Sequence, residues 1–330
     1  MKLNFLISDN AVFAADKPIR VFGEGNGVVS VRFLGEERTA KACGKWCAEF
    51  PPQKAGGPYE MTVTDGTETV TVKNLYIGRV YLLIGQSNAE FRLVESNTPG
   101  NDYESAGLLR GFFVKRPWIE NDVLAEEWKE AEKTGVGLWS ALGYLTGRNV
   151  RKKSSEPVGV ISCFQGASII ESWLPKEKAE GFKLPVQDLH IDHTYPEYVA
   201  WNKDGVIYEK MLSRLFPFSL SGVIWYQGES DTTAAEAEIY KDELKCLIDT
   251  VREGAKNEKL PFVVVQIADF DPRDDDGWHA VQNAQQKAVS ETPYCALAES
   301  RDVCETDAIH PPTKTKLAER IAEEMTGIKS

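Results

Sequence analysis

The sequence predicts an α/β protein, in which a doubly wound parallel sheet of about five strands follows a small all-β domain. Two patterns predict this fold class. From about residue 78 onward, short unbroken apolar runs alternate with segments of helical periodicity. Before that point, apolar residues recur with period two between turn residues. The chain has 330 residues, of which 42% are hydrophobic, and it can therefore bury a core for a large domain and a smaller one.

Residues 1–77 are predicted to form the all-β domain. The clearest signal is a hairpin, in which Asp65-Gly66 separates two runs of alternating apolar residues. No helical periodicity occurs in this segment. We therefore place an accessory β domain at residues 1–77 and an α/β domain at residues 78–330.

The predicted strands of the α/β domain are apolar runs without polar alternation, which is the pattern of strands buried on both faces of a parallel sheet. These runs are 80–84, 158–164, 222–226, 261–267 and 294–298. Each predicted helix has one apolar face. The helical segments are 137–149, 240–251, 278–289 and 317–325. Residues 91–111 are expected to form a loop over the site, and no element is predicted in residues 173–204.

The charge and the apolar pattern argue against several classes of partner. The formal net charge is -12 and the isoelectric point is about 5.0. Because an acidic surface repels phosphate groups, we expect neither a nucleic acid nor an anionic membrane as partner. We see no signal-peptide pattern and no membrane-spanning stretch, so we expect a cytoplasmic protein. The six cysteines are scattered and are interpreted as free thiols.

A serine follows the first strand of the predicted parallel sheet. The residues Gly85-Gln86-Ser87-Asn88 come directly after the run 80–84. They therefore lie at the carboxyl end of a strand, where open α/β sheets bind their ligands. The same residues also fit a simple strand-to-helix turn with an N-cap, so this segment alone does not decide between the two interpretations.

A second motif lies near the carboxyl terminus, where Asp307 precedes His310 by three residues. A carboxylate at this spacing can hold the imidazole in one tautomer and leave the other ring nitrogen free to accept a proton from a serine. A helix N-cap after a surface turn has the same spacing. We favour the catalytic interpretation because the chain has only four histidines and because Pro311 and Pro312 stiffen this loop.

Two other strand ends complete a candidate site for acyl transfer. Gly166 follows the second strand, and Gln227 follows the third. The backbone N–H groups of Ser87 and Gly166 and the side-chain amide of Gln227 supply three donors for an oxyanion, each worth about 10² to 10³ in rate. Ser87 is then the nucleophile. The G-x-S-x-G elbow of the α/β-hydrolases is absent, because Ala89 occupies the position of its second glycine.

Taken together, the motifs resemble those of the SGNH-type serine hydrolases. The narrower resemblance is to the sialate O-acetylesterase group, which is related to the acetylxylan esterases of carbohydrate esterase family 6. It runs nearly end to end, and the β segment that contains residues 51–59 looks like the amino-terminal β domain of bacterial members. The motifs that carry it are Gly85-Gln86-Ser87-Asn88, Gln165-Gly166 with Glu171 and Trp173, Trp225 to Asp231, and Asp307-x-x-His310-Pro311.

The resemblance implies a flavodoxin-like SGNH sheet and a serine esterase that removes acetyl groups from sugar hydroxyls without a metal or other cofactor. At the matching positions, Ser87 is the nucleophile, His310 the base and Asp307 its orienter. Ser87, Gly166 and Gln227 form the oxyanion hole. Substrate binding or support of the site is assigned to Gln86, Asn88, Glu171 and Glu229.

The chain departs from the family pattern in ways that leave the substrate contacts open. Residues 163–167, Cys-Phe-Gln-Gly-Ala, replace a more usual Trp-Gly-Gly-Thr run, and Gln282 stands where an arginine is common. The chain also looks shorter than many bacterial relatives. The alternatives are an acetylxylan esterase or another SGNH esterase, and a glycan-binding protein without catalysis.

Other candidate sites have weaker patterns. His190 and His193 supply half of a metal site, and the sequence places no third ligand. The acidic run 269–277 lacks EF-hand spacing, because Pro272 occupies the first loop position, so we interpret it as a solvated loop. The sequence assigns no role to His190, His193 or His279. Five tryptophans can serve as core residues or as a sugar-stacking platform, and the sequence does not separate these roles. They are Trp118, Trp128, Trp139, Trp173 and Trp201.

Overall fold

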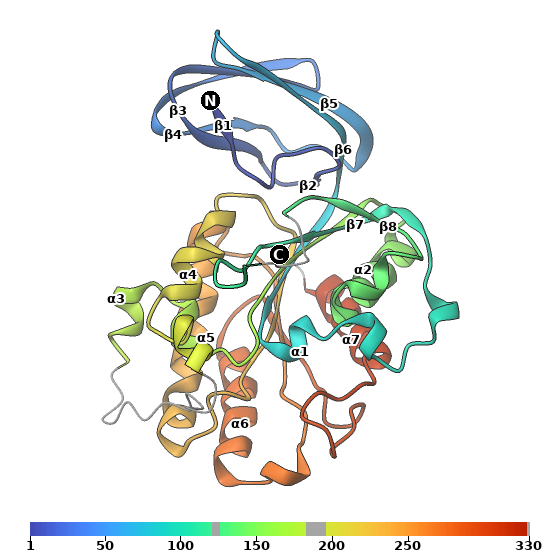
Figure 1. Ribbon diagram of the computed structural model, residues 1–330, viewed down its shortest axis with the longest axis vertical. Coiled ribbons are helices and arrows are strands. Elements are labelled where there is room, and N and C mark those ends of the chain that lie inside the picture. Colours follow the sequence, from blue (N-terminus) through green and yellow to red (C-terminus); the bar gives the residue numbers. More distant parts are fainter. Residues whose placement is uncertain (121–125, 183–195, 329–330) are drawn as a thin grey trace.

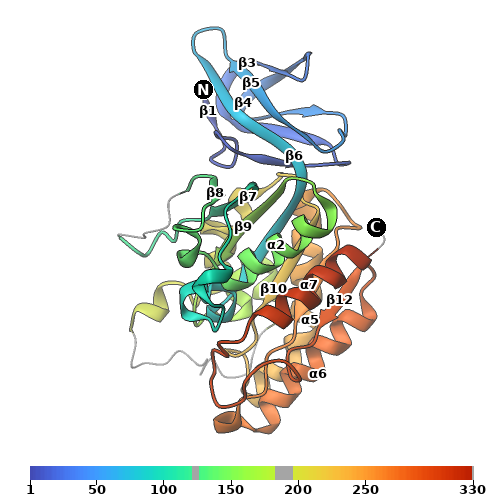
Figure 2. The same cartoon turned by 90° about the vertical axis from the view of Figure 1, so that its right-hand side faces the viewer.

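The computed structural model describes residues 1–120, 126–182 and 196–328. Every element that it assigns before residue 87 is a β-strand, and strands alternate with helices after that residue. Figures 1 and 2 show the N-terminal strands grouped above a larger part in which helices flank a sheet. The predicted α/β architecture is therefore confirmed.

The N-terminal strands form a mostly antiparallel group. They are β1 (Lys2–Leu3), β2 (Val12–Ala14), β3 (Ile19–Phe33), β4 (Glu36–Phe50), β5 (Gly56–Thr64) and β6 (Thr69–Gly85). Strand β3 pairs antiparallel with β1, β4 and β5, and β5 pairs with β6. The predicted hairpin at Asp65-Gly66 is confirmed, since Thr64 pairs with Thr69 and the Asp65 carboxylate accepts the Glu68 N–H at 2.9 Å.

Strand β6 belongs to both parts of the molecule. Its first half pairs with β5 and with β2, and from Arg79 onward it pairs with strands of the parallel sheet. The first half alternates between covered and exposed side chains, whereas the last six residues are all buried. Such a change is expected where a strand leaves an antiparallel sheet that has one face in solvent and enters a parallel sheet that is covered on both faces. Because β6 is shared, twelve strands form one continuous hydrogen-bonded network.

The α/β part is built on a parallel sheet with the order β7-β9-β6-β10-β11-β12. Without the edge strand β7, this is the flavodoxin-type order, in which the first strand of the fold lies at the topological switch point. A short strand, β8, joins β7 in the antiparallel direction. These strands are β7 (Ala106–Phe113), β8 (Lys129–Ala131), β9 (Val158–Phe164), β10 (Gly222–Tyr226), β11 (Phe262–Val265) and β12 (Cys295–Ala298).

The prediction of about five strands was too low, because the described residues contain six parallel strands. The missed strand is β7, which lies partly inside residues 91–111, where we expected a loop. The sequence of β7 has glycines at positions 107 and 111 and a charged residue, Arg110, which break the apolar run. Arg110 is nevertheless 1% exposed. Its guanidinium donates to the backbone oxygens of Asn10 and Asn74, at 2.9 and 2.7 Å.

Helices cover both faces of the parallel sheet. Helices α2 and α7 pack against each other on one face, and α5 and α6 pack against each other on the other face. The four long helices are α2 (Ala141–Ser154), α5 (Ala234–Ala255), α6 (Asp276–Glu291) and α7 (Thr315–Gly327). The short ones are α1 (Ser87–Glu90), α3 (Lys176–Ala179) and α4 (Val206–Lys210). The 3₁₀ turns are η1 (Leu93–Glu95), η2 (Gly100–Asp102), η3 (Val136–Leu138), η4 (Ile170–Trp173), η5 (Pro196–Ala200), η6 (Leu212–Leu215) and η7 (Asp271–Arg273).

Helix α2 has different ends from the predicted segment 137–149. It begins after Ser140, whose hydroxyl caps it by accepting the Gly143 N–H at 3.2 Å. It continues to Ser154, five residues beyond the predicted end, and its last turn contains the basic residues Arg151, Lys152 and Lys153. Positive side chains are favourable there because the carboxyl end of a helix is the negative end of its dipole.

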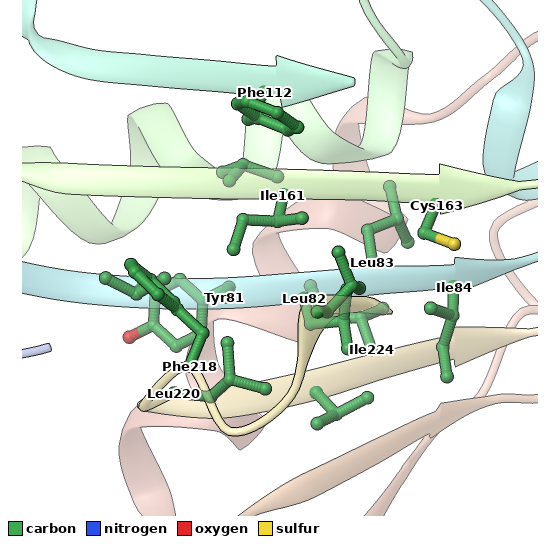
Figure 3. Close-up of a cluster of buried hydrophobic side chains, with 14 of the residues drawn as sticks. Tyr81, Leu82, Leu83, Ile84, Phe112, Ile161, Cys163, Phe218, Leu220 and Ile224 are labelled. Carbon is green, nitrogen blue, oxygen red and sulfur yellow. The ribbon is translucent and has the colours of Figure 1, made fainter. Parts of the chain in front are cut away.

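The second half of β6 lies at the centre of the core. Figure 3 shows Leu82 and Ile84 of β6 among apolar side chains of neighbouring strands, including Ile161 and Ile224. All four are at most 1% exposed. Burial of one such side chain contributes about 1.5 to 3 kcal/mol. The strand end that leads to Ser87 is therefore held in place by fully buried side chains.

Part of the unassigned stretch 173–204 is helical, in η4, α3 and η5, and residues 183–195 lie outside the described residues. None of the described helices has the length and apolarity needed to cross a membrane.

Candidate active site

Ser87 is the first residue of α1 and lies just beyond the carboxyl end of β6. Gly85 makes this position possible. Its φ is +142°, and a Cβ atom there would lie 2.0 Å from the backbone oxygen of Tyr226 on β10. Only glycine permits such a close approach of β6 and β10. The chain can therefore turn sharply into α1 and present the Ser87 side chain at the edge of the sheet.

The Ser87 hydroxyl faces the imidazole of His310. The distance from Oγ to Nε2 is 2.8 Å, across a separation of 223 residues in the chain. A serine and a histidine in direct hydrogen-bond contact are the nucleophile and the base of serine esterases and proteases. The structure thus brings together two of the residues that the sequence singled out.

The surroundings of His310 favour the neutral imidazole. Loss of hydration lowers its pKa first, and the charge of Lys314 lowers it further, whereas Glu95 opposes them. The ring of Phe91 lies next to it, with the two ring centroids 6.1 Å apart. A neutral imidazole can accept the proton of Ser87 at neutral pH.

Two backbone N–H groups next to Ser87 are free for an oxyanion. Those of Ser87 and Gly166 donate no hydrogen bond to another described residue. A Cβ atom on Gly166 would lie 3.7 Å from the Cβ of Ser87, so this loop passes close to Ser87. The role of these two N–H groups in an oxyanion hole stays a prediction.

A family-wide sequence model described as "Carbohydrate esterase, sialic acid-specific acetylesterase" matches residues 77–327. The chain belongs to this acetylesterase family.

Individual relatives are similar over most of this acetylesterase-family chain. Human sialate O-acetylesterase is 27% identical over 313 residues, which cover 84% of this chain and 59% of the human protein. The mouse sialate O-acetylesterase is 23% identical over 340 residues, which cover 84% of this chain and 62% of the mouse protein. The chain therefore spans less than two thirds of the length of these curated relatives. A carbohydrate acetylesterase from Xanthomonas citri matches the fold with a TM-score of 0.87 at 27% identity, over 99% of this chain and 75% of that one.

Gln227 lies at the predicted position, but its amide hydrogens are already used. Nε2 donates to the backbone oxygen of Ser168 at 2.8 Å and to the carboxylate of Asp231. Its Oε1 accepts the hydroxyl of Tyr240 at 2.9 Å, and the residue is fully buried. In this arrangement the side-chain amide of Gln227 has no N–H left for an oxyanion. It holds the loop that carries Gly166 against β10 instead.

Asp307 lies on the same loop as His310 without touching it. Its side chain is exposed and makes no hydrogen bond or ion pair with any other described residue. The role of Asp307 as the orienter of His310 stays a prediction. Catalytic contacts are often long or absent in a free enzyme and tighten in the substrate complex.

Three of the predicted support residues form a buried network under Ser87. Gln86 accepts the Gly228 N–H through Oε1 at 3.3 Å. Asn88 donates through Nδ2 to Glu229 Oε1 at 2.6 Å and to the backbone oxygen of Ile309 at 2.9 Å. Burial raises the pKa of Glu229. Because Gln86, Asn88 and Glu229 are all at most 8% exposed, they support the site from below and offer substrate little surface.

The sequence analysis missed one member of this network, Lys314, whose ammonium donates to Asn88 Oδ1 at 2.8 Å. A lysine is normally solvated, and nothing in the local pattern marks this one as buried.

Glu171, the fourth predicted support residue, belongs to a buried acidic group instead. It lies in η4, and burial raises its pKa to about 7, with the charge of Glu236 adding to this effect. Burial also raises the pKa of Asp231 well above its usual value. Asp231 accepts the N–H of Ile170 at 3.0 Å, so this group holds η4 in place. No described contact joins Glu171 to Ser87.

The remaining sequence candidates lie elsewhere. His190 and His193 are outside the described residues. His279, on α6, binds Asp274 at 2.6 Å, and Asp275 caps the same helix by accepting the N–H of Trp278. No group of three or more His, Cys, Asp or Glu side chains that could hold a metal ion occurs among the described residues.

Aromatic side chains lie beside the Gly166 loop. The indole N–H of Trp118 donates to Gln165 Oε1 at 2.6 Å. The rings of Trp118 and Trp201 lie 5.7 Å apart, and Tyr198 packs on Trp201 at 5.3 Å. Trp118 is partly exposed, whereas Trp201 is buried. Trp118 therefore offers an aromatic surface in contact with Gln165, the residue that precedes Gly166 of the candidate oxyanion hole.

Proposed function

We propose that this protein is a serine acetylesterase that hydrolyses acetyl esters on sugar hydroxyls, with O-acetylated sialic acid as the foremost substrate. The observation that carries this proposal is the 2.8 Å contact between Ser87 Oγ and His310 Nε2, in a chain of the sialic acid-specific acetylesterase family. The relatives named sialate O-acetylesterase and the similar carbohydrate acetylesterase from Xanthomonas citri support the substrate class.

The first half of the proposed reaction forms an acetyl-enzyme. Ser87 Oγ attacks the ester carbonyl carbon while His310 Nε2 takes the hydroxyl proton. The carbonyl oxygen becomes an oxyanion, which the N–H groups of Ser87 and Gly166 stabilise. When the tetrahedral intermediate collapses, His310 gives the proton to the departing sugar oxygen, and the acetyl group stays on Ser87. Each donor contributes about 10² to 10³ in rate.

The second half returns the free enzyme. A water molecule gives a proton to His310 and attacks the acetyl carbonyl, and the same N–H groups stabilise the second oxyanion. Collapse of this intermediate breaks the bond to Ser87 Oγ, to which His310 returns the proton. Acetate leaves. The reaction needs no cofactor in this scheme. Asp307 orients the imidazole in the substrate complex.

The serine mechanism is tested with Ser87→Ala. We expect this variant to lose at least about 10⁴-fold in kcat on an activated acetyl ester, because the hydroxyl forms the covalent bond. A fluorophosphonate probe should label the parent protein at Ser87 and leave Ser87→Ala unlabelled. An equal turnover in parent and variant would refute the mechanism. An unlabelled and inactive parent would favour the glycan-binding alternative.

The substrate class is tested by release of acetate from two acetylated carbohydrates. We expect faster release from O-acetylated sialic acid than from acetylated xylan. The reverse preference would identify an acetylxylan esterase, and activity on lipid esters alone would indicate another SGNH esterase.

Because Trp118 is partly exposed next to Gln165, we propose that it contacts the sugar ring.

We also propose that residues 1–77 act as an accessory β domain of a catalytic domain that covers residues 78–330. The family match beginning at residue 77 supports this division. Residence in the cytoplasm and the absence of nucleic acid or membrane partners stay predictions from the sequence.

A further inference from the structure

Lys314 lies four residues after His310, at the start of α7, and its side chain is 1% exposed. A buried ammonium loses its hydration and needs compensating contacts. The amino end of a helix adds a further cost, because the positive end of the dipole repels a cation. The contacts of Lys314 must offset both costs.

These contacts all lie under the candidate active site. The ammonium donates to Asn88 Oδ1 at 2.8 Å. It also lies 5.1 Å from the ring centroid of Phe91 and 5.5 Å from that of Tyr226, both within the range of cation–π attraction. Phe91 packs on His310, and Asn88 directly follows Ser87. Lys314 thus touches neighbours of both the nucleophile and the base.

The ammonium fixes the orientation of the Asn88 amide. With its oxygen bound to Lys314, the NH₂ end must face Glu229 Oε1, at 2.6 Å, and the backbone oxygen of Ile309, at 2.9 Å. A flipped amide would place NH₂ against the ammonium and oxygen against a carboxylate. Both contacts would be unfavourable, because an amide NH₂ is only a donor and a carboxylate only an acceptor. The Ile309 oxygen belongs to the peptide bond that leads to His310.

We propose that Lys314 is a positioning residue for the esterase reaction proposed above, on which this inference rests. Its buried ammonium orients Asn88, and Asn88 fastens the His310 loop to the residue that follows Ser87. The 2.8 Å contact between Ser87 Oγ and His310 Nε2 depends on this Asn88 clamp, which consists of Lys314, Asn88 and the backbone oxygen of Ile309. Lys314 touches neither substrate nor the reacting atoms.

The charge of Lys314 also acts on the base. Burial first, and Lys314 second, lower the pKa of His310, and Glu95 is the group that opposes them. Burial in turn lowers the pKa of Lys314 to about 8, although three nearby acidic groups, Cys304, Glu229 and Glu305, oppose this shift. Below about pH 8 the lysine is therefore charged. In that range it stabilises the orientation of Asn88 and disfavours protonation of His310.

The test compares Lys314→Met with a matched control on the same helix, Lys316→Met. Lys316 is exposed, and we expect its variant to behave as the parent. We expect Lys314→Met to lower kcat on an activated acetyl ester by about 10²-fold, the loss that a 1 Å misplacement causes, with little change in KM. The acid limb of kcat/KM should move to higher pH, because loss of the cation lets His310 bind a proton more readily. A merely structural lysine would leave this limb unmoved.

A double-mutant cycle tests the route through Asn88. Because Lys314 acts on the loop through Asn88, Lys314→Met combined with Asn88→Ala should lose little more kcat than the worse single variant. Additive losses would overturn the clamp. Should Lys314→Met fail to fold by circular dichroism, Lys314→Gln replaces it in the same measurements, since it lacks the charge and keeps a neutral donor.

The outcomes separate this inference from the proposed function. A parental kcat and an unmoved acid limb in Lys314→Met, with Ser87→Ala inactive, would refute the role of Lys314 and leave the esterase standing. An inactive and unlabelled parent would refute the esterase itself.

Discussion

At the scale of single residues, only one of the two ring nitrogens of His310 has a hydrogen-bond partner among the described residues. Nε2 binds Ser87, and Nδ1 has no hydrogen bond to another described residue. An imidazole held on one side only can rotate, and a catalytic base works best in one tautomer and one orientation. A partner for Nδ1 therefore requires that the loop of Asp307 rearranges in the substrate complex. Without such a rearrangement, His310 acts without an orienting carboxylate.

The roles of Asp307 and His310 can be ranked by substitution. We expect Asp307→Asn to lower kcat by at most about 10⁴-fold and His310→Ala by about 10⁶-fold, because an orienter is less essential than the base. Asp302→Asn is the matched control, since Asp302 is an exposed residue of the same loop that pairs with Arg320. Steady-state kinetics on an activated acetyl ester gives the order. A larger loss in Asp307→Asn than in His310→Ala would contradict these roles.

The sequence predicted residues with local signatures better than residues with distant partners. Ser87 follows a recognisable strand end, and His310 belongs to a short motif with prolines, so both could be found. The hydrogen bonds of Gln227 depend on Ser168 and Asp231, and the burial of Lys314 depends on Asn88, 226 residues away. Such contacts form only when the chain is folded, and no local pattern reports them.

At the scale of elements, the first turn of α2 is tied to α1. The Ser140 hydroxyl donates to the backbone oxygen of Ala89 at 2.6 Å and also caps α2. The Ala141 N–H donates to the backbone oxygen of Phe91 at 2.8 Å. The segment that follows Ser87 is therefore fastened to one of the long helices that cover the sheet.

Removal of this cap should cost stability. We expect Ser140→Ala to lower the free energy of unfolding by about 1 to 3 kcal/mol, because it removes a helix cap and leaves the buried Ala89 oxygen unpaired. Urea unfolding followed by circular dichroism measures the change. Ser290→Ala, at an exposed position near the end of α6, is the control and should stay within about 0.5 kcal/mol of the parent. An equal effect of both substitutions would speak against the cap.

Two predictions of secondary structure, the start of α2 and the loop at residues 91–111, were wrong for physical reasons. Periodicity predicted a helix from residue 137 because Leu138 is in phase with later leucines, but Leu138 belongs to η3 and is 50% exposed. A 3₁₀ turn followed by a cap cannot be told from a helix by spacing alone. Strand β7 was missed because Arg110 lies in it. The carbonyl oxygens that allow its burial come from Asn10, in the turn before β2, and from Asn74 of β6.

At the scale of the whole molecule, the N-terminal strands are fastened to the α/β part through buried polar contacts. The indole N–H of Trp128 donates to the backbone oxygen of Leu6 at 2.9 Å. Arg20 donates to the backbone oxygen of Ala255 at 3.0 Å. The Arg110 guanidinium lies 4.2 Å from the ring centroid of Tyr76 and also pairs with Glu130 at 2.8 Å. The predicted boundary at residues 77 and 78 falls inside β6, where its partner strands change.

We expect Arg110→Met to destabilise the molecule by about 2 to 4 kcal/mol, because it leaves the oxygens of Asn10 and Asn74 without their donor. Unfolding should stay a single transition in parent and variant, since both parts share β6 and these contacts. Arg38→Met is the control, because Arg38 forms an exposed ion pair with Glu36. Thermal unfolding with two well-separated transitions in the parent would contradict this coupling.

The sharing of β6 has a consequence for how this chain can evolve. Side chains alternate along a strand, so the gain or loss of one residue turns all that follow to the opposite face. A one-residue insertion in the first half of β6 would have to be absorbed by a bulge, or it would carry the shift into the parallel sheet and to Ser87. Length changes should therefore accumulate in the hairpin turns of homologous chains, and β6 should keep a constant length even where its side chains have diverged.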